Sequence, residues 1–409
     1  MTISTRPPLF SEHDEMQLVA DAQFVVTPGP EILDRLRAQF EPLRSVIAID
    51  DITGDIVGAA KVYSVALTVP GGAIHPAGVL DEVGVLLTHR RRGALTAMLG
   101  DHFAELTQRG ELFSLLKASE SSIYPSFGFG CRHDAWTYEF QSRASKFLPG
   151  AQSLCDGDAG SLRMIRPAEW HTMLPTLYSE WTRQRGAGVV RGSNWWALHY
   201  FASAAVQQGD SSGVMVIGHF DQHGVLDGFA SYSGSGNWDN GIRSQRLQIY
   251  DLAATNPVAY LRLWRALLDH DLVDTICLWN GDSDEPIRWA LADPRRMATT
   301  SRGDGWYIRL VNIEGGLNAR TYESSEPLLM GVVDRHLPAN TGVYQFADGV
   351  WTRGTAEPEL SLDVSEVGAI FFGQQSVSAL VSVGRVIEHV PGSAVRADRI
   401  FLSPCAAAR

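Results

Sequence analysis

The residues of this chain best suited to chemistry lie in one stretch, THRRRGALTAML (88–99), in which three arginines precede a glycine. Consecutive arginines offer charge-assisted hydrogen bonds to phosphate oxygens. Gly93 has no side chain, so the backbone there can approach an anion closely. If a helix begins at this glycine, its first N–H groups point outward and its dipole favours negative charge. The pattern Arg90-x-x-Gly93 therefore predicts a site for a diphosphate or a similar anion.

The sequence around this loop predicts the elements that position it. GVLDEVGVLL (78–87) is a strand pattern, and residues 93–110 form an amphipathic helix with apolar side chains at helical spacing. Two β-branched runs predict a β-hairpin over residues 43–68, and FSLLKAS (113–119) is the next predicted strand. The loop thus joins a strand to a helix in an α/β layer.

The middle third of the chain repeats this order of elements. Two strand patterns flank a DQHG turn at 221–224, and a strand at 245–254 precedes an amphipathic helix at 256–271. VDTICLW and GWYIRLVN are expected to complete this second layer. We therefore predict two similar α/β domains, joined across the Gly-, Ser- and Asp-rich segment 149–161.

The chain has 409 residues, which at roughly 150 residues per domain allows two to three domains. The pattern changes near the end of the second repeat, and residues 359–375 indicate a strand followed by a short helix. This is typical of a smaller α+β domain. The predicted boundaries are 1–148, 149–312 and 313–409.

Composition excludes several classes of function. The apolar fraction of 45% is that of a globular protein, and the net charge of −12 repels nucleic-acid backbones and attracts cations. The 4 cysteines form no CxxC pair. His219 and His223 are four residues apart, but they lie across a predicted turn and have no HExxH glutamate. No apolar run approaches the ~20 residues that cross a bilayer, and the N-terminus has no signal-peptide pattern. We expect a cytoplasmic protein with no nucleic-acid or membrane partner and no metal.

Several motifs resemble a known family. Arg90 and Gly93 match the acetyl-CoA loop of the GNAT acyltransferases, Arg/Gln-x-x-Gly-x-Gly/Ala, although Leu95 replaces the last small residue. Together with KASESSIYPSFGFG (117–130) and the three-part chain, the loop resembles the Eis (enhanced intracellular survival) N-acetyltransferases. The resemblance implies two GNAT domains in tandem, a C-terminal sterol-carrier-protein-like domain, and acetyl-CoA as the acetyl donor. At the corresponding point before its helix the second repeat has no RxxG, and the helix opens with Pro257, so one cofactor site per chain is expected.

The resemblance also implies where acetyl-CoA binds. The pantetheine arm would lie along a strand whose main-chain groups pair with its amides, as in strand addition. The pyrophosphate would lie at the start of the following helix, and the end of the next strand would complete the site. The predicted cofactor-binding residues are Val83, Gly84, Val85, Arg90, Arg91, Arg92, Gly93, Ala94, Leu95, Thr96, Ser119 and Glu120.

Catalytic and substrate-binding roles follow from the same resemblance. Tyr124 matches the tyrosine that acts as general acid, and a phenol with an ordinary pKa near 10 keeps its proton at neutral pH. The family's general base is the terminal carboxylate, here the α-carboxylate of Arg409. Glu82 is the competing base, because other GNAT enzymes use a glutamate on that strand. Phe24 and Glu82 are the predicted substrate-binding residues.

Eis proteins acetylate amines on aminoglycosides and cationic peptides. The resemblance therefore implies a cationic amine substrate, a role in aminoglycoside antibiotic resistance, and a homo-oligomer, specifically a hexamer. Two alternatives stay open from the sequence. One is a protein or peptide lysine N-acetyltransferase, and the other is a non-catalytic protein that binds CoA or another small molecule.

Overall fold

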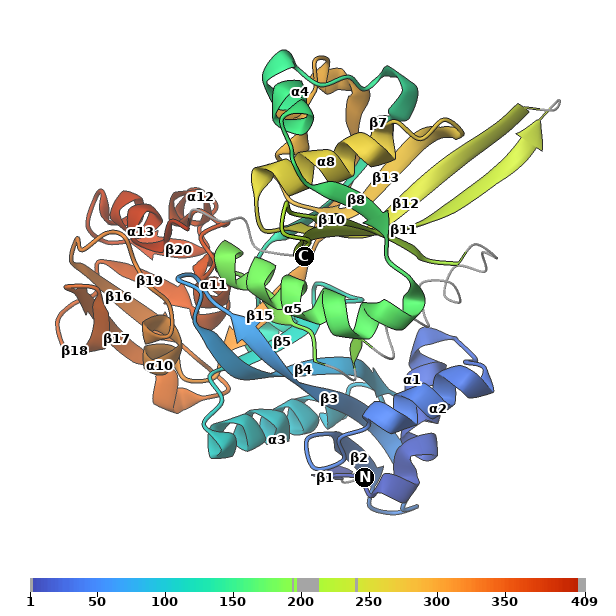
Figure 1. Cartoon of the computed structure of the whole chain (residues 1–409). Coiled ribbons are helices and arrows are strands. Elements are labelled where there is room, and N and C mark those ends of the chain that lie inside the picture. The colour runs from blue at the N-terminus through green and yellow to red at the C-terminus, as the bar shows by residue number, and fades with distance from the viewer. Residues whose placement is uncertain (1–2, 193–194, 197–212, 240–241, 404–409) are drawn as a thin grey trace. The chain divides into compact units, whose positions relative to one another are not determined.

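The computed structural model describes residues 3–192, 195–196, 213–239 and 242–403 (Figure 1). The chain forms two compact units, one built from Met1–His133 with Gly305–Pro404 and the other from Asp134–Asp304. None of the helices in these described ranges is long and apolar enough to cross a membrane.

The first unit contains a sheet with strand order β1-β2-β3-β4-β5-β15-β6. The strands are Ile3–Arg6 (β1), Val46–Asp50 (β2), Ile56–Thr68 (β3), Ile74–Val85 (β4), Phe113–Lys117 (β5), Trp306–Leu310 (β15) and Gly130–Cys131 (β6). The pair β4–β5 is parallel, and helix α3 (Ala94–Arg109) connects these strands, as a parallel pair requires. The predicted hairpin β2–β3 and the strand–loop–helix–strand order are confirmed.

Helices cover both faces of this sheet, because alternate residues of each strand point to opposite sides. On one face Ile47 packs in a cluster with Met16 of α1. On the other face the next residue, Ala48, packs with Met98 of α3. The N-terminal helices are His13–Phe24 (α1) and Pro30–Gln39 (α2).

The first unit also contains a smaller sheet with order β18-β17-β16-β19-β20. Its strands are Val350–Gly354 (β18), Gly342–Ala347 (β17), Leu328–Val333 (β16), Leu360–Asp363 (β19) and Val386–Glu388 (β20). Its helices are Ile313–Asn318 (α10), Val364–Ile370 (α11), Val377–Ser382 (α12) and Ser393–Phe401 (α13). Helix α11 packs against β6 and β15, so this α+β part is attached to the edge of the first sheet.

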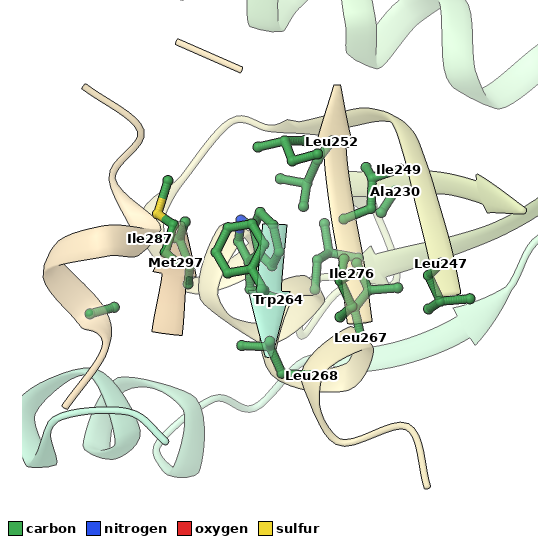
Figure 2. Packing of buried hydrophobic residues seen from close by; sticks show 14 of the residues in the cluster. Ala230, Leu247, Ile249, Leu252, Trp264, Leu267, Leu268, Ile276, Ile287 and Met297 are labelled. Atoms are coloured by element: carbon green, nitrogen blue, oxygen red, sulfur yellow. The ribbon is translucent and has the colours of Figure 1, made fainter. Parts of the chain in front are cut away.

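The second unit contains a sheet with order β14-β7-β13-β12-β11-β10-β8. The strands are Met297–Asp304 (β14), Asp134–Gln141 (β7), Val273–Gly281 (β13), Ile242–Ala254 (β12), Leu226–Asp239 (β11), Met215–Phe220 (β10) and Ser161–Met164 (β8). The unit further includes Pro149–Asp156 (α4), Pro167–Arg185 (α5), Gly188–Val190 (β9), Pro257–Leu268 (α8) and Ile287–Ala290 (α9). The order β10-β11-β12-α8-β13 repeats that of the first unit, as predicted. Figure 2 shows part of its core, where Trp264 and Leu267 of α8 lie among apolar side chains of the strands.

Three local expectations are corrected by the structure. Trp306–Leu310, expected in the second layer, pairs with β5 and β6 in the first sheet. Conversely, Asp134–Gln141, which lies inside the predicted first domain of 1–148, pairs with β13 and β14 in the second sheet. The segment 149–161, expected to be a linker, begins with helix α4, whose Cys155 is buried in the second core. Burial of the Cys155 side chain, with Ala151 packed beside the same core, favours a helix despite the turn-forming composition.

Candidate active site

The strand expected to bind the cofactor carries a β-bulge. The register of the β3–β4 ladder shifts between Ala59 and Lys61. There two β4 residues, Glu82 and Val83, stand opposite one residue of β3, which is the arrangement of a bulge. Glu82 has φ of +47°, a conformation that is unfavourable for a residue with a side chain. Surrounding contacts must therefore hold the bulge in place.

Beyond the bulge, β4 and β5 separate. Their pairing ends at Leu80 with Leu116, although β4 continues to Val85. The edge of β4 from the bulge onward faces no strand in the described part of the chain. Its main-chain groups are thus available to an extended ligand that carries amides. The predicted pantetheine-binding residues Val83, Gly84 and Val85 lie on this edge.

The predicted anion-binding loop follows β4 directly. Gly93 is the N-cap of α3 with φ of +86°, and nothing lies within 4 Å of the position that a Cβ would occupy. The Ala97 N–H donates to the carbonyl oxygen of Gly93 at 3.0 Å. Ala94 is buried in the core and Gly93 has no side chain, so no capping side chain occupies the first N–H groups of α3. This is the geometry that binds phosphates.

The arginines of the loop are exposed in front of this helix start. Arg90 donates to Gln23 Oε1 of α1 at 2.6 Å, which ties the loop to the first helix. Arg91 adopts a positive φ of +61°, so the chain turns sharply before Gly93. Thr96 is exposed and Leu95 is half-buried, while Ser119 and Glu120 lie exposed just after β5, where that strand has left β4.

Tyr124 opens the 3₁₀ helix η3 (Tyr124–Phe127) and is half-buried. Its ring meets Phe129 edge-on at a centroid distance of 6.0 Å. Burial and, to a smaller extent, the charge of Asp81 raise the pKa of the Tyr124 phenol. The phenol therefore carries its proton at neutral pH and can act as a hydrogen-bond donor.

The structure adds two residues that the sequence reasoning missed. Lys61 on β3 is fully buried and forms an ion pair with Glu82. The second residue is Asp81, whose side chain reaches solvent although much of it is surrounded by protein. This burial raises the pKa of the Asp81 carboxyl group. A hydrogen bond from the Glu82 N–H lowers the same pKa, but by less. The signal was present in the sequence, because Asp81 and Glu82 interrupt an otherwise apolar strand.

Not every predicted site residue is placed. Phe24 is the last residue of α1 and is 40% exposed, next to the Gln23 that binds the loop. Arg409 lies outside the described residues. Among the residues that are described, no group of three or more His, Cys, Asp or Glu side chains is arranged to hold a metal ion.

The second repeat differs at the equivalent helix start. The side chain of Asn256 caps α8 by accepting from Ala259 N at 2.9 Å, and Pro257 has no N–H to offer. The main-chain N–H groups that are predicted to bind an anion in the first unit are thus satisfied or missing here.

Comparisons with known proteins agree with this architecture. Acetyltransferase (GNAT) domain models match residues 6–132 and 187–310, and a sterol carrier protein domain model matches 313–407. An uncharacterized N-acetyltransferase of Streptomyces avermitilis is 31% identical over 86% of this chain and 85% of its own length. The N-acetyltransferase Eis of Mycobacterium tuberculosis is 27% identical over 94% of this chain and 93% of its own.

A solved structure extends the likeness to three dimensions. The crystal structure of Eis1 from Mycobacterium abscessus has a TM-score of 0.86 and 30% identity, and it covers 100% of this chain and 99% of that one. Sequence, domain order and fold thus agree over nearly the whole length. The chain belongs to the Eis family of GNAT N-acetyltransferases.

Proposed function

We propose that this N-acetyltransferase moves the acetyl group of acetyl-CoA to an amine of a polycationic small molecule, of which aminoglycosides are an example. The observation that carries the proposal is the separation of β4 from β5 after Leu80 and Leu116, before the start of α3, where the N-cap Gly93 provides no side-chain cap. The strand edge suits the pantetheine amides and the helix start suits the pyrophosphate. Tyr124 lies close enough to this strand for the charge of Asp81 to affect its pKa.

The proposed reaction is direct transfer. The neutral amine attacks the thioester carbonyl carbon and a C–N bond forms, giving a tetrahedral intermediate. When the C–S bond breaks, the Tyr124 phenol donates its proton to the departing sulfur, which leaves as the thiol CoA–SH. The amine proton passes to a base, and solvent restores the phenol. The products are an N-acetyl amine and CoA–SH.

The proposed base is the α-carboxylate of Arg409, as the family resemblance implies. Glu82 is less suited to this role, because its carboxylate is paired with the buried ammonium of Lys61. Asp81 is accessible and forms no ion pair within the described chain, so we assign it to the binding of the cationic amine. The net charge of −12 supports a cationic substrate through long-range attraction.

The experiment is a panel assay in which CoA thiol release from acetyl-CoA is followed with aminoglycosides, linear polyamines and lysine peptides. Turnover with the first two classes at kcat/KM well above that with peptides is the expected result. A preference for lysine peptides would instead identify a protein N-acetyltransferase. Absence of thiol release with every amine would contradict the proposal.

A further inference from the structure

Arg309 and Asp334 form a buried ion pair directly behind the turn that carries Tyr124. Arg309 lies on β15, and Asp334 directly follows β16. Arg309 Nη2 donates to both carboxylate oxygens of Asp334 at 2.8 Å, and both side chains are 0% exposed. The cost of desolvating such a pair offsets most of its attraction, so stability alone does not account for it.

The same guanidinium contacts the end of η3. Arg309 Nη1 donates to the carbonyl oxygen of Phe127, the last residue of that 3₁₀ helix. Gly128 follows with φ of +83°, and a Cβ there would lie 1.6 Å from Arg309 Nη1. Because the guanidinium of Arg309 packs directly on the main chain of the turn, only a residue without a Cβ fits at position 128.

A second contact reaches the turn from the Asp334 side. Asp334 Oδ1 accepts from the main-chain N–H groups of His336 and Leu337, at 3.1 and 3.0 Å, which fixes this loop. His336 Nε2 then donates to the carbonyl oxygen of Ser126 at 3.0 Å. Its ring also lies against Phe127, with a centroid distance of 5.0 Å. Two consecutive carbonyl groups of η3 are thus bound by one network.

The Arg309 guanidinium also contacts the aromatic rings that pack against Tyr124. The guanidinium carbon of Arg309 lies 4.4 Å from the ring centroid of Phe103. Phe103 meets Phe129 at 6.0 Å, and Phe129 meets Tyr124 at 6.0 Å. The Arg309 side chain therefore contacts both the main chain of the turn and the group of aromatic rings against which Tyr124 packs.

The turn would have room to move without this network. A cavity of about 210 Å³ lies beside it, lined by residues that include Pro125, Ser126, Gly128, Arg309 and His336. A cavity of this size holds several water molecules. Loss of the contacts would allow η3 to shift into this space while the rest of the fold stays intact.

We propose that Arg309 and Asp334 are positioning residues for Tyr124, and that through them the sterol-carrier-protein-like part of the chain sets the orientation of the phenol. The inference rests on the proposed role of Tyr124 as proton donor. It assigns a function in acetyl transfer to Asp334, which lies outside both acetyltransferase domains.

The test is a double-mutant cycle with a variant that leaves no unpaired buried charge. Arg309→Met with Asp334→Asn removes the ion pair, while Asn still accepts the N–H groups of the loop. Because a misplacement of ~1 Å can cost ~10²-fold in rate, we expect kcat to fall about 10- to 100-fold with the KM for acetyl-CoA nearly unchanged. Adding Tyr124→Phe to this variant should lower kcat much less than it does in the unmodified enzyme.

A matched control is available in the same unit. Arg44 and Glu111 form another nearly buried ion pair, so Arg44→Met with Glu111→Gln perturbs stability in a similar way. This control should keep both its kcat and the full effect of Tyr124→Phe. Unchanged kcat in the Arg309 and Asp334 variant, or fully additive effects with Tyr124→Phe, would overturn the proposal. Failure of the proton-donor role shows separately, as unchanged kcat for Tyr124→Phe alone, and the positioning proposal then falls with it.

A second variant keeps the test decisive if the ion-pair variant does not fold. His336→Ala removes only the half-buried contacts to Ser126 and Phe127. Loss of one hydrogen bond to the turn should lower kcat about two- to tenfold, again non-additively with Tyr124→Phe. A His336→Ala enzyme with unchanged kcat contradicts the proposal.

Discussion

Lys61 on β3 and Glu82 on the β4 bulge form an ion pair, although the Lys61 side chain is fully buried. Lys61 also donates to Gln17 of α1, so one ammonium group joins two strands and a helix. This contact helps to hold Glu82 at its positive φ and keeps the bulge from relaxing. It also makes the Glu82 carboxylate a structural partner rather than a free base.

The choice of base is tested by comparing Glu82→Gln with an enzyme extended by several residues after Arg409. Glu82→Gln should lower kcat only a few-fold, because the amide oxygen still accepts from Lys61. The extension replaces the α-carboxylate with an amide, which is not basic, and should lower kcat by about 10²-fold or more. Steady-state thiol release measures both. An extended enzyme with full kcat, together with an inactive Glu82→Gln enzyme, would reverse the assignment.

Asp81→Asn should raise the KM for the amine about tenfold and leave the KM for acetyl-CoA unchanged. One charge contact in partly solvated surroundings contributes roughly 1–2 kcal/mol, which corresponds to that factor. Asp101→Asn, which changes an exposed carboxylate on α3, is the control and should behave as the unmodified enzyme. An unchanged amine KM in Asp81→Asn would show that the acceptor binds elsewhere.

Tyr124→Phe should lower kcat about 10²-fold, near the lower end of the range for general acids, without changing acetyl-CoA affinity. The lower end applies because a phenol is already a weaker acid than a thiol, and burial raises the pKa of the Tyr124 phenol further, so its proton is given up less readily. The measurement is kcat by thiol release and the dissociation constant by calorimetry. If kcat is unchanged, water must deliver the proton.

Gly93→Asp should weaken acetyl-CoA binding at least about tenfold, because it places a negative charge against the pyrophosphate. Gly93→Asn is a nearly isosteric control without the charge, and Asn tolerates a positive φ better than most residues. Calorimetric titration of both variants isolates the charge effect.

Calorimetric titration of the unmodified chain with acetyl-CoA should give one site per chain. At the equivalent helix start in the second unit, the side chain of Asn256 takes up one N–H group and Pro257 has none to offer an anion. Two equivalent sites would contradict this.

The stability of the first unit should fall as the pH is lowered from 7 to 5. Burial, with the charges of Arg44 and Arg309, lowers the pKa of His102 to about 3. Below the unfolded-state pKa near 6.5 the unfolded chain binds this proton and the folded chain does not, so stability is lost as the pH falls through that value. At pH 5 this one group costs about 2 kcal/mol. Urea unfolding of His102→Gln should show a smaller change between the two pH values.

Ser114→Ala is the control for this measurement. Ser114 Oγ lies 2.7 Å from His102 Nε2, but its removal leaves the histidine buried. The pH dependence should therefore persist in Ser114→Ala. If His102→Gln and the unmodified protein lose the same stability between pH 7 and pH 5, another group causes the loss.

The sequence alone determined the features that depend on near neighbours along the chain. The hairpin, the amphipathic helix α3 and the Arg90–Gly93 loop follow from periodicity and turn-forming residues within a few positions of one another. For the same reason the repeat in the second unit was visible although the two repeats share little residue identity. The family resemblance then supplied the order of the three domains.

Only the tertiary structure decided the features that depend on residues distant in sequence. A strand pattern at Trp306–Leu310 does not state which sheet it joins, because pairing is chosen by hydrogen-bonding edges and packing between remote segments. Contacts between remote segments also produce three features of the site. These are the raised pKa of Asp81, the pairing of Lys61 with Glu82, and the contact of Arg309 with Phe127. Burial and charge proximity are properties of the assembled core, and no local pattern encodes them.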